Sequence, residues 1–180
     1  MASRGRVGLG IDIGGSGIKG APVDLDRGTF VVDRVKIATP QPATPEAVAA
    51  VVAEIVTAFA DDVPQDAPLG VTFPAVIQHG VARSAANVDR SWIGTNVEEL
   101  LSAVTGRRVL VVNDADAAAM AEHRYGAASG VDGVVLLTTL GTGIGTAVLV
   151  DGVLLPNTEF GHLEIDGYDA ETRASASAKE

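Results

Sequence analysis

Two glycine-rich segments, each placed between strand-like runs, constrain the fold more than any other feature of the sequence. The first, GIDIGGSGIKG, follows an alternating apolar run that ends at Ile13, and the second, TTLGTGIGTAV, lies between apolar runs at 134–140 and 144–150. Glycine beside a strand costs conformational entropy and leaves nothing to pack, so its use predicts close approach of another backbone or a ligand. The first segment is followed by strand-like residues, IKGAPV, which disfavours a P-loop or a dinucleotide-binding turn.

The rest of the pattern predicts an α/β chain whose strand order begins twice. Strands are expected at 7–13, 17–23, 30–37, 69–73, 109–112, 134–140, 144–150 and 153–155. Helices are expected from an N-cap at Thr44 to Phe59, from Asn96 to Gly106, and over 115–126. The order β-β-β-α-β-α-β-α-β-β therefore predicts an N-terminal domain of residues 1–114 and the start of a second domain over 115–180.

Composition and charge exclude several classes of protein. The chain has 180 residues of which 47% are hydrophobic, so it can bury a core and is not globally disordered. Its net charge of −10 argues against a general nucleic-acid binder. Apolar runs stay well short of the roughly 18 residues of a membrane span, and the sequence begins without a signal-peptide pattern. Because the chain also has no cysteine, we expect a cytoplasmic protein without a membrane partner.

The two glycine segments are predicted to bind phosphate. Successive backbone N–H groups can point at an anion where no Cβ is in the way. Lys19 can reach a phosphate oxygen, and Asp12 at the end of the strand can hold a metal ion through water. A tight hairpin with ordinary surface charge remains the alternative for the first segment alone. Two such hairpins, one opening each expected domain, could clamp a phosphate chain from both sides.

Asn113 and Asp114 lie between an apolar strand and a helix, where α/β sheets place ligand sites. Phosphoryl transfer to an alcohol needs a carboxylate that accepts the hydroxyl proton, and Asp114 is the candidate. The alternatives are that Asp114 only caps the helix, or that Asp116 is the base instead.

The segment NTEFGHLEIDG places Glu159, His162 and Glu164 within six residues. Carboxylates and an imidazole at this spacing can hydrogen-bond the neighbouring hydroxyls of a polyol. A metal site is the weaker alternative, because no third nitrogen or sulfur ligand is nearby in the sequence.

Taken together, these stretches resemble the ROK family of sugar kinases, within the hexokinase–actin-like superfamily, and most of all its actinobacterial polyphosphate glucokinase branch. The similarity runs almost from Arg6 to Glu180 and includes TPQPATPEAV, AANVDRSWIGTN, NDADAAAMAEHRYGA and LLPNTEFGHLE. It implies an actin-like, ribonuclease-H-like ATPase fold. It also implies transfer of a phosphoryl group from inorganic polyphosphate, or ATP, to the 6-hydroxyl of glucose with the assistance of Mg²⁺, and a homodimer in the complete protein.

The resemblance also implies roles for single residues. Asp114 matches the catalytic base, and Asp12 matches the position that holds Mg²⁺ through water. The residues that match the sugar site are Asn87, Asn113, Glu159 and His162, with a third glutamate that is either Glu171 or a residue beyond Glu180. The residues that match the phosphate loops are Gly14, Gly15, Ser16, Gly17 and Lys19 in the first segment and Gly141, Thr142, Gly143 and Gly145 in the second.

Two departures from the family pattern matter. The cysteine-rich zinc motif of many members is absent, so zinc is not expected. The family also continues beyond Glu180, so we expect a C-terminally truncated chain whose strands over 134–150 expose an apolar face.

Several alternatives remain for the function. One alternative is an ATP-dependent kinase of another hexose, and a second is an inactive truncated member of the family. A sugar-responsive repressor is rejected, because only six residues precede Val7, and a non-catalytic actin-like assembly protein has no need of the sugar-site residues. Polyphosphate rests on resemblance alone, since the arginines that would form a basic track are scattered along the sequence: Arg83, Arg90, Arg107, Arg108 and Arg124.

Overall fold

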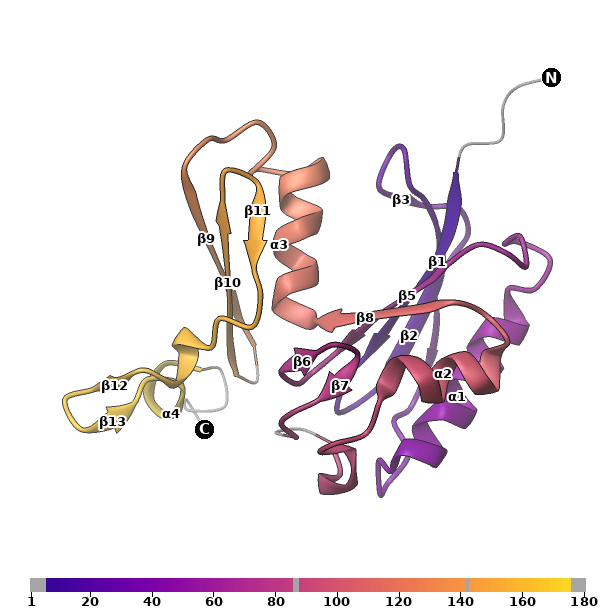
Figure 1. Ribbon diagram of the computed structural model, residues 1–180, viewed down its shortest axis with the longest axis horizontal. Coiled ribbons are helices and arrows are strands. Elements are labelled where there is room, and N and C mark those ends of the chain that lie inside the picture. The colour runs from indigo at the N-terminus through magenta and orange to yellow at the C-terminus, as the bar shows by residue number, and fades with distance from the viewer. Residues whose placement is uncertain (1–5, 86–87, 142, 176–180) are drawn as a thin grey trace. The chain divides into compact units, whose positions relative to one another are not determined.

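The computed structural model describes residues 6–85, 88–141 and 143–175. The chain divides into two compact units, Met1–Val112 and Asn113–Glu180, and each is described by itself (Figure 1). This division places Asn113 and Asp114 in the same unit as Glu159 and His162. Among the helices of the described residues, none is both long and apolar enough to span a membrane.

The first unit is built on a mixed sheet in which the strands follow the order β3-β2-β1-β5-β8, with β4 also paired to β2. β1 pairs antiparallel with β2 and parallel with β5. The bounds of these strands are β1 Val7–Ile13, β2 Ile18–Asp24, β3 Thr29–Phe30, β4 Val35–Ile37, β5 Leu69–Phe73 and β8 Val109–Asn113. The parallel neighbours β1 and β5 therefore present their carboxyl ends at one edge of the sheet, beside the first glycine segment.

Helices α1 (Pro45–Ala58) and α2 (Val97–Thr105) pack against each other beside this sheet, as Figure 1 shows. The predicted caps are confirmed, because Thr44 accepts a hydrogen bond from the Ala47 amide and Asn96 accepts one from the Glu99 amide. α2 ends at Gly106, whose φ of 65° is the left-handed conformation typical of a helix C-terminus. The core between helices and sheet is formed by Ile11, Ile13, Val48, Val52, Ile55, Leu69, Phe73 and Leu101.

Trp92 gives the segment AANVDRSWIGTN a structural purpose that its sequence alone does not reveal. It belongs to a short 3-10 helix, Arg90–Trp92, and is fully buried. Its Nε1 atom donates to the carbonyl oxygen of Ala43 across 2.8 Å, and its ring lies 4.6 Å from that of Phe73. The 3-10 helix is thereby fastened to the chain just before α1 by one buried aromatic side chain, whose polar atom is satisfied.

The prediction of one strand over residues 30–37 is wrong. The chain forms β3 and β4 with a bend between them, and Val31 and Val32 are exposed. Apolar side chains at these two positions mimic a strand in the sequence, although both are exposed. A small hairpin, β6 (Ile77–Gln78) and β7 (Val81–Ala82), was not predicted, because two-residue strands carry no readable periodicity.

The second unit packs helix α3 (Asp114–Tyr125) against one face of an antiparallel sheet. The strands are β9 (Val134–Leu140), β10 (Ile144–Val150) and β11 (Val153–Leu155), as expected from the sequence. Ala115 and Ala119 of α3 contact Ala147 and Leu149 of β10, so small helical residues allow a close approach. Beyond β11 the chain adds the 3-10 helix Phe160–His162, the hairpin β12 (Glu164–Ile165) and β13 (Tyr168–Asp169), and the single turn α4 (Glu171–Ala174).

The opposite face of this sheet carries exposed apolar side chains. Cross-strand register places Leu136 opposite Val148 and Val148 opposite Leu155, on the face turned away from α3. The exposed members are Val134, Leu136, Leu140, Val150, Val153 and Leu155. The predicted exposure of an apolar face over 134–150 is therefore confirmed.

Candidate functional site

The first glycine segment is the turn of the β1–β2 hairpin, and it brings Asp12 and Lys19 together. The two residues are direct partners in the strand register, and Nζ of Lys19 lies 3.0 Å from Oδ2 of Asp12. The other oxygen, Oδ1, accepts a hydrogen bond from the Thr72 hydroxyl across 2.8 Å. Because Thr72 stands beside Asp12 on the parallel neighbour β5, the carboxylate is held from two strands at once.

The tip of this hairpin is closed by its own backbone. The Gly14 amide donates to the carbonyl oxygen of Gly17 across 3.2 Å, and the Thr39 hydroxyl donates to the carbonyl oxygen of Gly14. Gly15 and Ser16 lie exposed between these two fixed positions. An anion at this turn would therefore meet the exposed backbone of Gly15 and Ser16.

In the second unit, the cap of α3 is Asn113 and not Asp114. Oδ1 of Asn113 accepts hydrogen bonds from the amides of Ala115, across 2.8 Å, and Asp116, across 3.2 Å. Asp114 is the first residue of the helix and is exposed, with its Oδ1 atom 2.9 Å from the Ala115 amide. The alternative that Asp114 serves as the helix cap is therefore wrong, and the helix begins one residue earlier than expected.

Asp116, unlike Asp114, is buried, at 2% exposure. Its Oδ2 atom accepts a hydrogen bond from the Asn157 amide across 2.9 Å. Burial raises the pKa of this carboxyl above its ordinary value, and the bond from Asn157 opposes that effect. An enclosed carboxyl that already anchors a loop is a poor candidate for a base that must reach a substrate hydroxyl.

The segment that carries Glu159 and His162 is fixed to β10 by a reciprocal pair of threonines. The Thr146 hydroxyl donates to the Thr158 carbonyl oxygen, and the Thr158 hydroxyl donates back to the Thr146 carbonyl oxygen across 3.1 Å. The Phe160 amide donates to the Thr146 hydroxyl as well, across 2.9 Å. Glu159 thus directly precedes, and His162 ends, a short 3-10 helix whose N-terminal side is fastened to β10.

Electrostatics identify the neighbours of Glu159 within the second unit. Burial raises the pKa of Glu159, the charge of His162 opposes this, and the charges of Asp114, Asp116 and Glu171 raise it further. The pKa of His162 is raised above its ordinary value, first by its hydrogen bond to Asp169 and also by Glu171 and Glu159. Three of the residues that the sequence assigned to the sugar therefore lie in one electrostatic cluster with Asp114.

Glu171 links this cluster to the second glycine segment. Its Oε2 atom accepts a hydrogen bond from the amide of Ile144, across 2.8 Å, at the point where β10 begins. A Cβ atom at Gly143 would overlap the Glu171 carboxylate. The absence of a Cβ at Gly143 thus leaves room for the Glu171 carboxylate in its present position, a contact that the sequence interpretation of the loop as a phosphate nest did not consider.

Some predicted site residues are not brought together or are not described. Asn87 and Thr142 lie outside the described residues. Arg107 does not belong to any basic track, because it is buried and its guanidinium donates to backbone carbonyl oxygens, among them that of Pro64 across 2.7 Å. Among the residues that the structure describes, no three His, Cys, Asp or Glu side chains form a group that could hold a metal ion. A single carboxylate such as Asp12 still suits Mg²⁺, which keeps most of its waters and shares phosphate oxygens with its substrate.

Sequence reasoning missed Thr72 and Asp169, which contact Asp12 and His162. The parallel pairing of β1 with β5 aligns Thr72 with Asp12, and that alignment cannot be read from either strand alone. Asp169 lies seven residues from His162 and reaches it only because a hairpin of two-residue strands returns the chain.

Comparison with known proteins agrees with this picture. The ROK family model matches residues 8–176. Polyphosphate glucokinase of Mycobacterium tuberculosis is 57% identical over 180 residues, which are 99% of this chain and 66% of that protein. The polyphosphate glucokinase of Mycobacterium leprae is 58% identical over 96% of this chain and 52% of its own length. The chain therefore spans between about half and two thirds of the length of these relatives.

Solved structures give the same result for the fold. The inorganic polyphosphate/ATP-glucomannokinase of Arthrobacter sp. strain KM matches with a TM-score of 0.92 and 58% identity, over 97% of this chain and 70% of that one. A ROK family glucokinase from Streptomyces griseus, in complex with glucose and AMPPNP, matches with a TM-score of 0.83 and 28% identity, over 96% of this chain and 58% of that one. The chain therefore has the actin-like ATPase fold expected from its sequence, and it belongs to the ROK family.

Proposed function

We propose that this chain carries residues for phosphoryl transfer from inorganic polyphosphate, or ATP, to the 6-hydroxyl of glucose. One observation carries the proposal: the segment before Glu159 is tied to β10 through the Thr146–Thr158 pair and to α3 through the bond of the Asn157 amide to Asp116, two residues from the exposed Asp114. The names of the mycobacterial and Arthrobacter relatives support both the donor and the sugar.

Asp114 is the general base in this proposal. Its carboxylate is exposed at the first turn of α3, and the fixed cap at Asn113 holds that turn in place. As the phosphoryl group transfers, the 6-hydroxyl loses its proton to this carboxylate, so that the attacking oxygen gains negative charge without forming a free alkoxide. The positive end of the helix dipole lies at the same turn and favours the negative charge that gathers there.

Glu159, His162 and Glu171 orient the sugar. Carboxylate oxygens accept hydrogen bonds from adjacent hydroxyls, and a protonated imidazole donates one to a hydroxyl oxygen. The 3-10 helix Phe160–His162 is fixed to β10, so these contacts are largely preorganised before the sugar binds.

In the first unit, Gly15, Ser16 and Lys19 are the candidate contacts for the phosphate donor. In the second unit, Gly141 and Gly143 of the glycine segment are candidate phosphate contacts. Asp12 would hold Mg²⁺ through water. When bound, the metal would neutralise negative charge on the donor phosphates. Lys19 and Asp12 already face each other across the hairpin, so both charges are available where the donor arrives. For the complete protein we infer a homodimer, as the resemblance implies.

The test is formation of glucose 6-phosphate by this chain with Mg²⁺, comparing polyphosphate and ATP as donors, and mannose as a second acceptor because of the Arthrobacter relative. Asp114→Asn is expected to lower turnover by about 10²- to 10⁴-fold while glucose binding, measured by calorimetry, is retained. Asp66→Asn removes an exposed carboxylate from the first unit and serves as the matched control. Near-normal turnover by Asp114→Asn removes it as the base, and a folded chain that neither binds glucose nor turns it over contradicts the proposal.

A further inference from the structure

The Asp169 carboxylate joins two elements of the candidate sugar site. Asp169 ends β13, and its Oδ2 atom lies 3.0 Å from Nδ1 of His162. Its Oδ1 atom accepts a hydrogen bond from the Glu171 amide across 2.9 Å, at the first residue of α4. One carboxylate therefore contacts the imidazole of one candidate sugar ligand and the backbone of another.

The connection continues from Glu171 to the second glycine segment. The Glu171 side chain accepts the Ile144 amide across 2.8 Å, so the order of contacts runs from His162 through Asp169 and Glu171 to the start of β10. The Asp169 carbonyl oxygen also accepts the Thr172 hydroxyl across 2.6 Å, which fastens the turn of α4 to the same residue. A substitution of Asp169 would therefore alter the positions of both candidate sugar ligands, His162 and Glu171.

We propose that Asp169 is a positioning residue for sugar binding, acting through His162 and Glu171. The inference rests on the proposed function, because it assigns Asp169 a role at the same sugar site. Nδ1 of His162 donates to the Asp169 carboxylate, which fixes the plane of the ring and directs Nε2 to the opposite side. Nε2 is then the atom that donates a hydrogen bond to a sugar hydroxyl.

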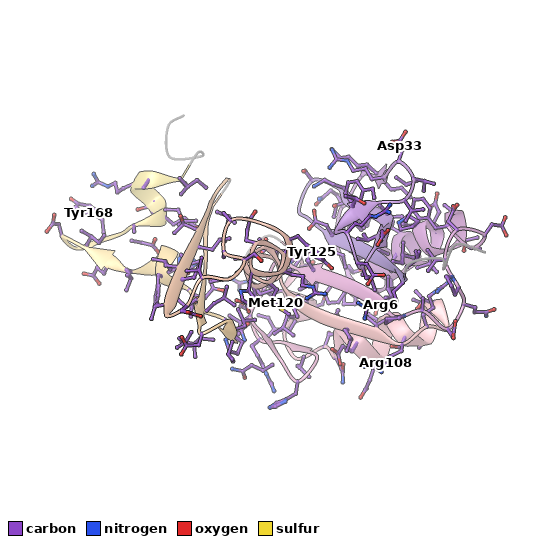
Figure 2. The ribbon with its side chains drawn as sticks, turned by 90° about the horizontal axis from the view of Figure 1, so that it is seen from above. Arg6, Asp33, Arg108, Met120, Tyr125 and Tyr168 are labelled. Atoms are coloured by element: carbon purple, nitrogen blue, oxygen red, sulfur yellow. The ribbon has the colours of Figure 1, made fainter. Side chains whose placement is uncertain are left out.

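The local contacts hold the pair of Asp169 and His162 in one arrangement, unlike a transient ion pair on the surface. An isolated pair between partly exposed charges adds little to stability, and side-chain exposures of 51% for His162 and 39% for Asp169 put this pair in that class. Here, however, the second oxygen of Asp169 is held by a backbone amide, which removes most of the freedom of the carboxylate. The guanidinium of Arg173 lies 3.7 Å from the centre of the Tyr168 ring, and this contact joins α4 to β13 a second time; Figure 2 labels Tyr168.

The negative groups around His162 act in the same direction as Asp169. The groups that raise its pKa are Asp169, Glu171 and Glu159, while its partial burial lowers it. The charged imidazole, with N–H donors on both nitrogens, is thereby favoured over the neutral ring. Glucose affinity that depends on a donor at Nε2 would decline as the pH rises through the raised pKa of His162.

The first test is an NMR titration of the histidine rings. The sequence has three histidines, His79, His123 and His162, so only three ring signals have to be assigned. In Asp169→Asn the pKa of His162 is expected to fall, because the carboxylate that raises it is lost. The Asn side chain keeps an oxygen for the Glu171 amide, so the variant retains the fold. Asp166→Asn is the matched control, because it removes the same charge from the same hairpin at a residue with φ of 54°, which asparagine tolerates.

The second test is glucose affinity by calorimetry as a function of pH. Asp169→Asn is expected to weaken glucose binding roughly tenfold and to move the pH at which affinity declines to a lower value. Asp169→Glu keeps a carboxylate and is expected to recover part of both effects. Asp166→Asn is expected to match the unmodified chain in affinity and in pH profile.

The outcomes separate the two proposals. An unchanged His162 pKa in Asp169→Asn overturns the positioning role, whatever glucose does. A lowered His162 pKa with unchanged glucose affinity and pH profile also overturns it. Failure of the unmodified chain to bind glucose, with the His162 pKa still lowered in Asp169→Asn, overturns the proposed function while the pairing of Asp169 with His162 stands.

Discussion

The amide of Asn157 donates a hydrogen bond to Oδ2 of Asp116 across 2.9 Å, so helix α3 anchors the loop that leads to Glu159. The other oxygen of Asp116, Oδ1, is buried and has no hydrogen-bond partner among the described residues. Asp116 and Asp114 are two residues apart on one helix, and burial gives them different tasks. The exposed carboxylate can meet a substrate, whereas the buried one connects α3 to a loop.

Asp116→Asn is expected to stabilise the chain at neutral pH by about 1 kcal/mol, because a neutral amide is less costly to bury than a carboxylate with one unpaired oxygen. Its side-chain oxygen can still accept the Asn157 amide. Burial raises the pKa of Asp116 above 3.8, so the native chain holds this proton more tightly than the unfolded chain. The stability that the protonated Asp116 carboxyl contributes is fully present below pH 3.8, the ordinary pKa of the group. It is lost as the pH rises through the raised pKa of the folded chain.

Urea unfolding of both chains between pH 4 and pH 8 checks this prediction. The stability advantage of Asp116→Asn should grow as the pH rises, whereas the exposed control Asp132→Asn should show no such trend. An advantage that is equal at all pH values would mean that Asp116 is not protonated more readily in the folded chain.

Gly161→Ala is expected to destabilise the second unit by roughly 1–3 kcal/mol and to weaken glucose binding. A Cβ atom at this position overlaps the carbonyl oxygen of Ile144, and a main-chain atom inside a sheet cannot move aside easily. The 3-10 helix that carries Glu159 and His162 would therefore shift away from β10.

Gly141→Ala provides the comparison, because no atom lies within 4 Å of a Cβ placed there. Thermal unfolding and glucose calorimetry on the two variants should separate them clearly. Equal stability of both would show that the approach of Gly161 to Ile144 is not a tight constraint.

Features that depend on neighbouring residues in the sequence could be predicted. The cap at Thr44 and the end of α2 at Gly106 are local signals, and both are confirmed. The strands of the second unit were predicted because long apolar runs with glycine turns leave few alternatives. The segment of residues 30–37 failed for the opposite reason, since exposed Val31 and Val32 imitate a buried pattern.

The contacts within the site could not be predicted in the same way, because they join residues that are distant in sequence or fall in very short elements. Asp12 meets Thr72 only through a parallel strand pair, and His162 meets Asp169 only through the small β12–β13 hairpin. The sequence also did not distinguish Asn113 from Asp114 as the cap, because both residues are good caps and only the position of the first helical turn decides between them.

Arg107→Ala is expected to destabilise the first unit by about 2–4 kcal/mol. The buried guanidinium donates to the carbonyl oxygens of Pro64, across 2.7 Å, and of Ala67 and Val63, each across 3.4 Å. These carbonyl oxygens belong to the connection between α1 and β5, which loses its donors when the side chain is removed. Arg107→Lys replaces the forked guanidinium by one ammonium group, so its stability should lie between those of the unmodified chain and Arg107→Ala.

Urea unfolding followed by Trp92 fluorescence measures the effect, because Trp92 is the single tryptophan of the sequence and lies buried in the first unit. Arg108→Ala is the matched control, since the neighbouring side chain extends outward from the first unit (Figure 2). Loss of stability confined to Arg107→Ala would show that this arginine acts in folding and is not part of a phosphate-binding track. A drop in polyphosphate affinity without any loss of stability would return Arg107 to the donor site.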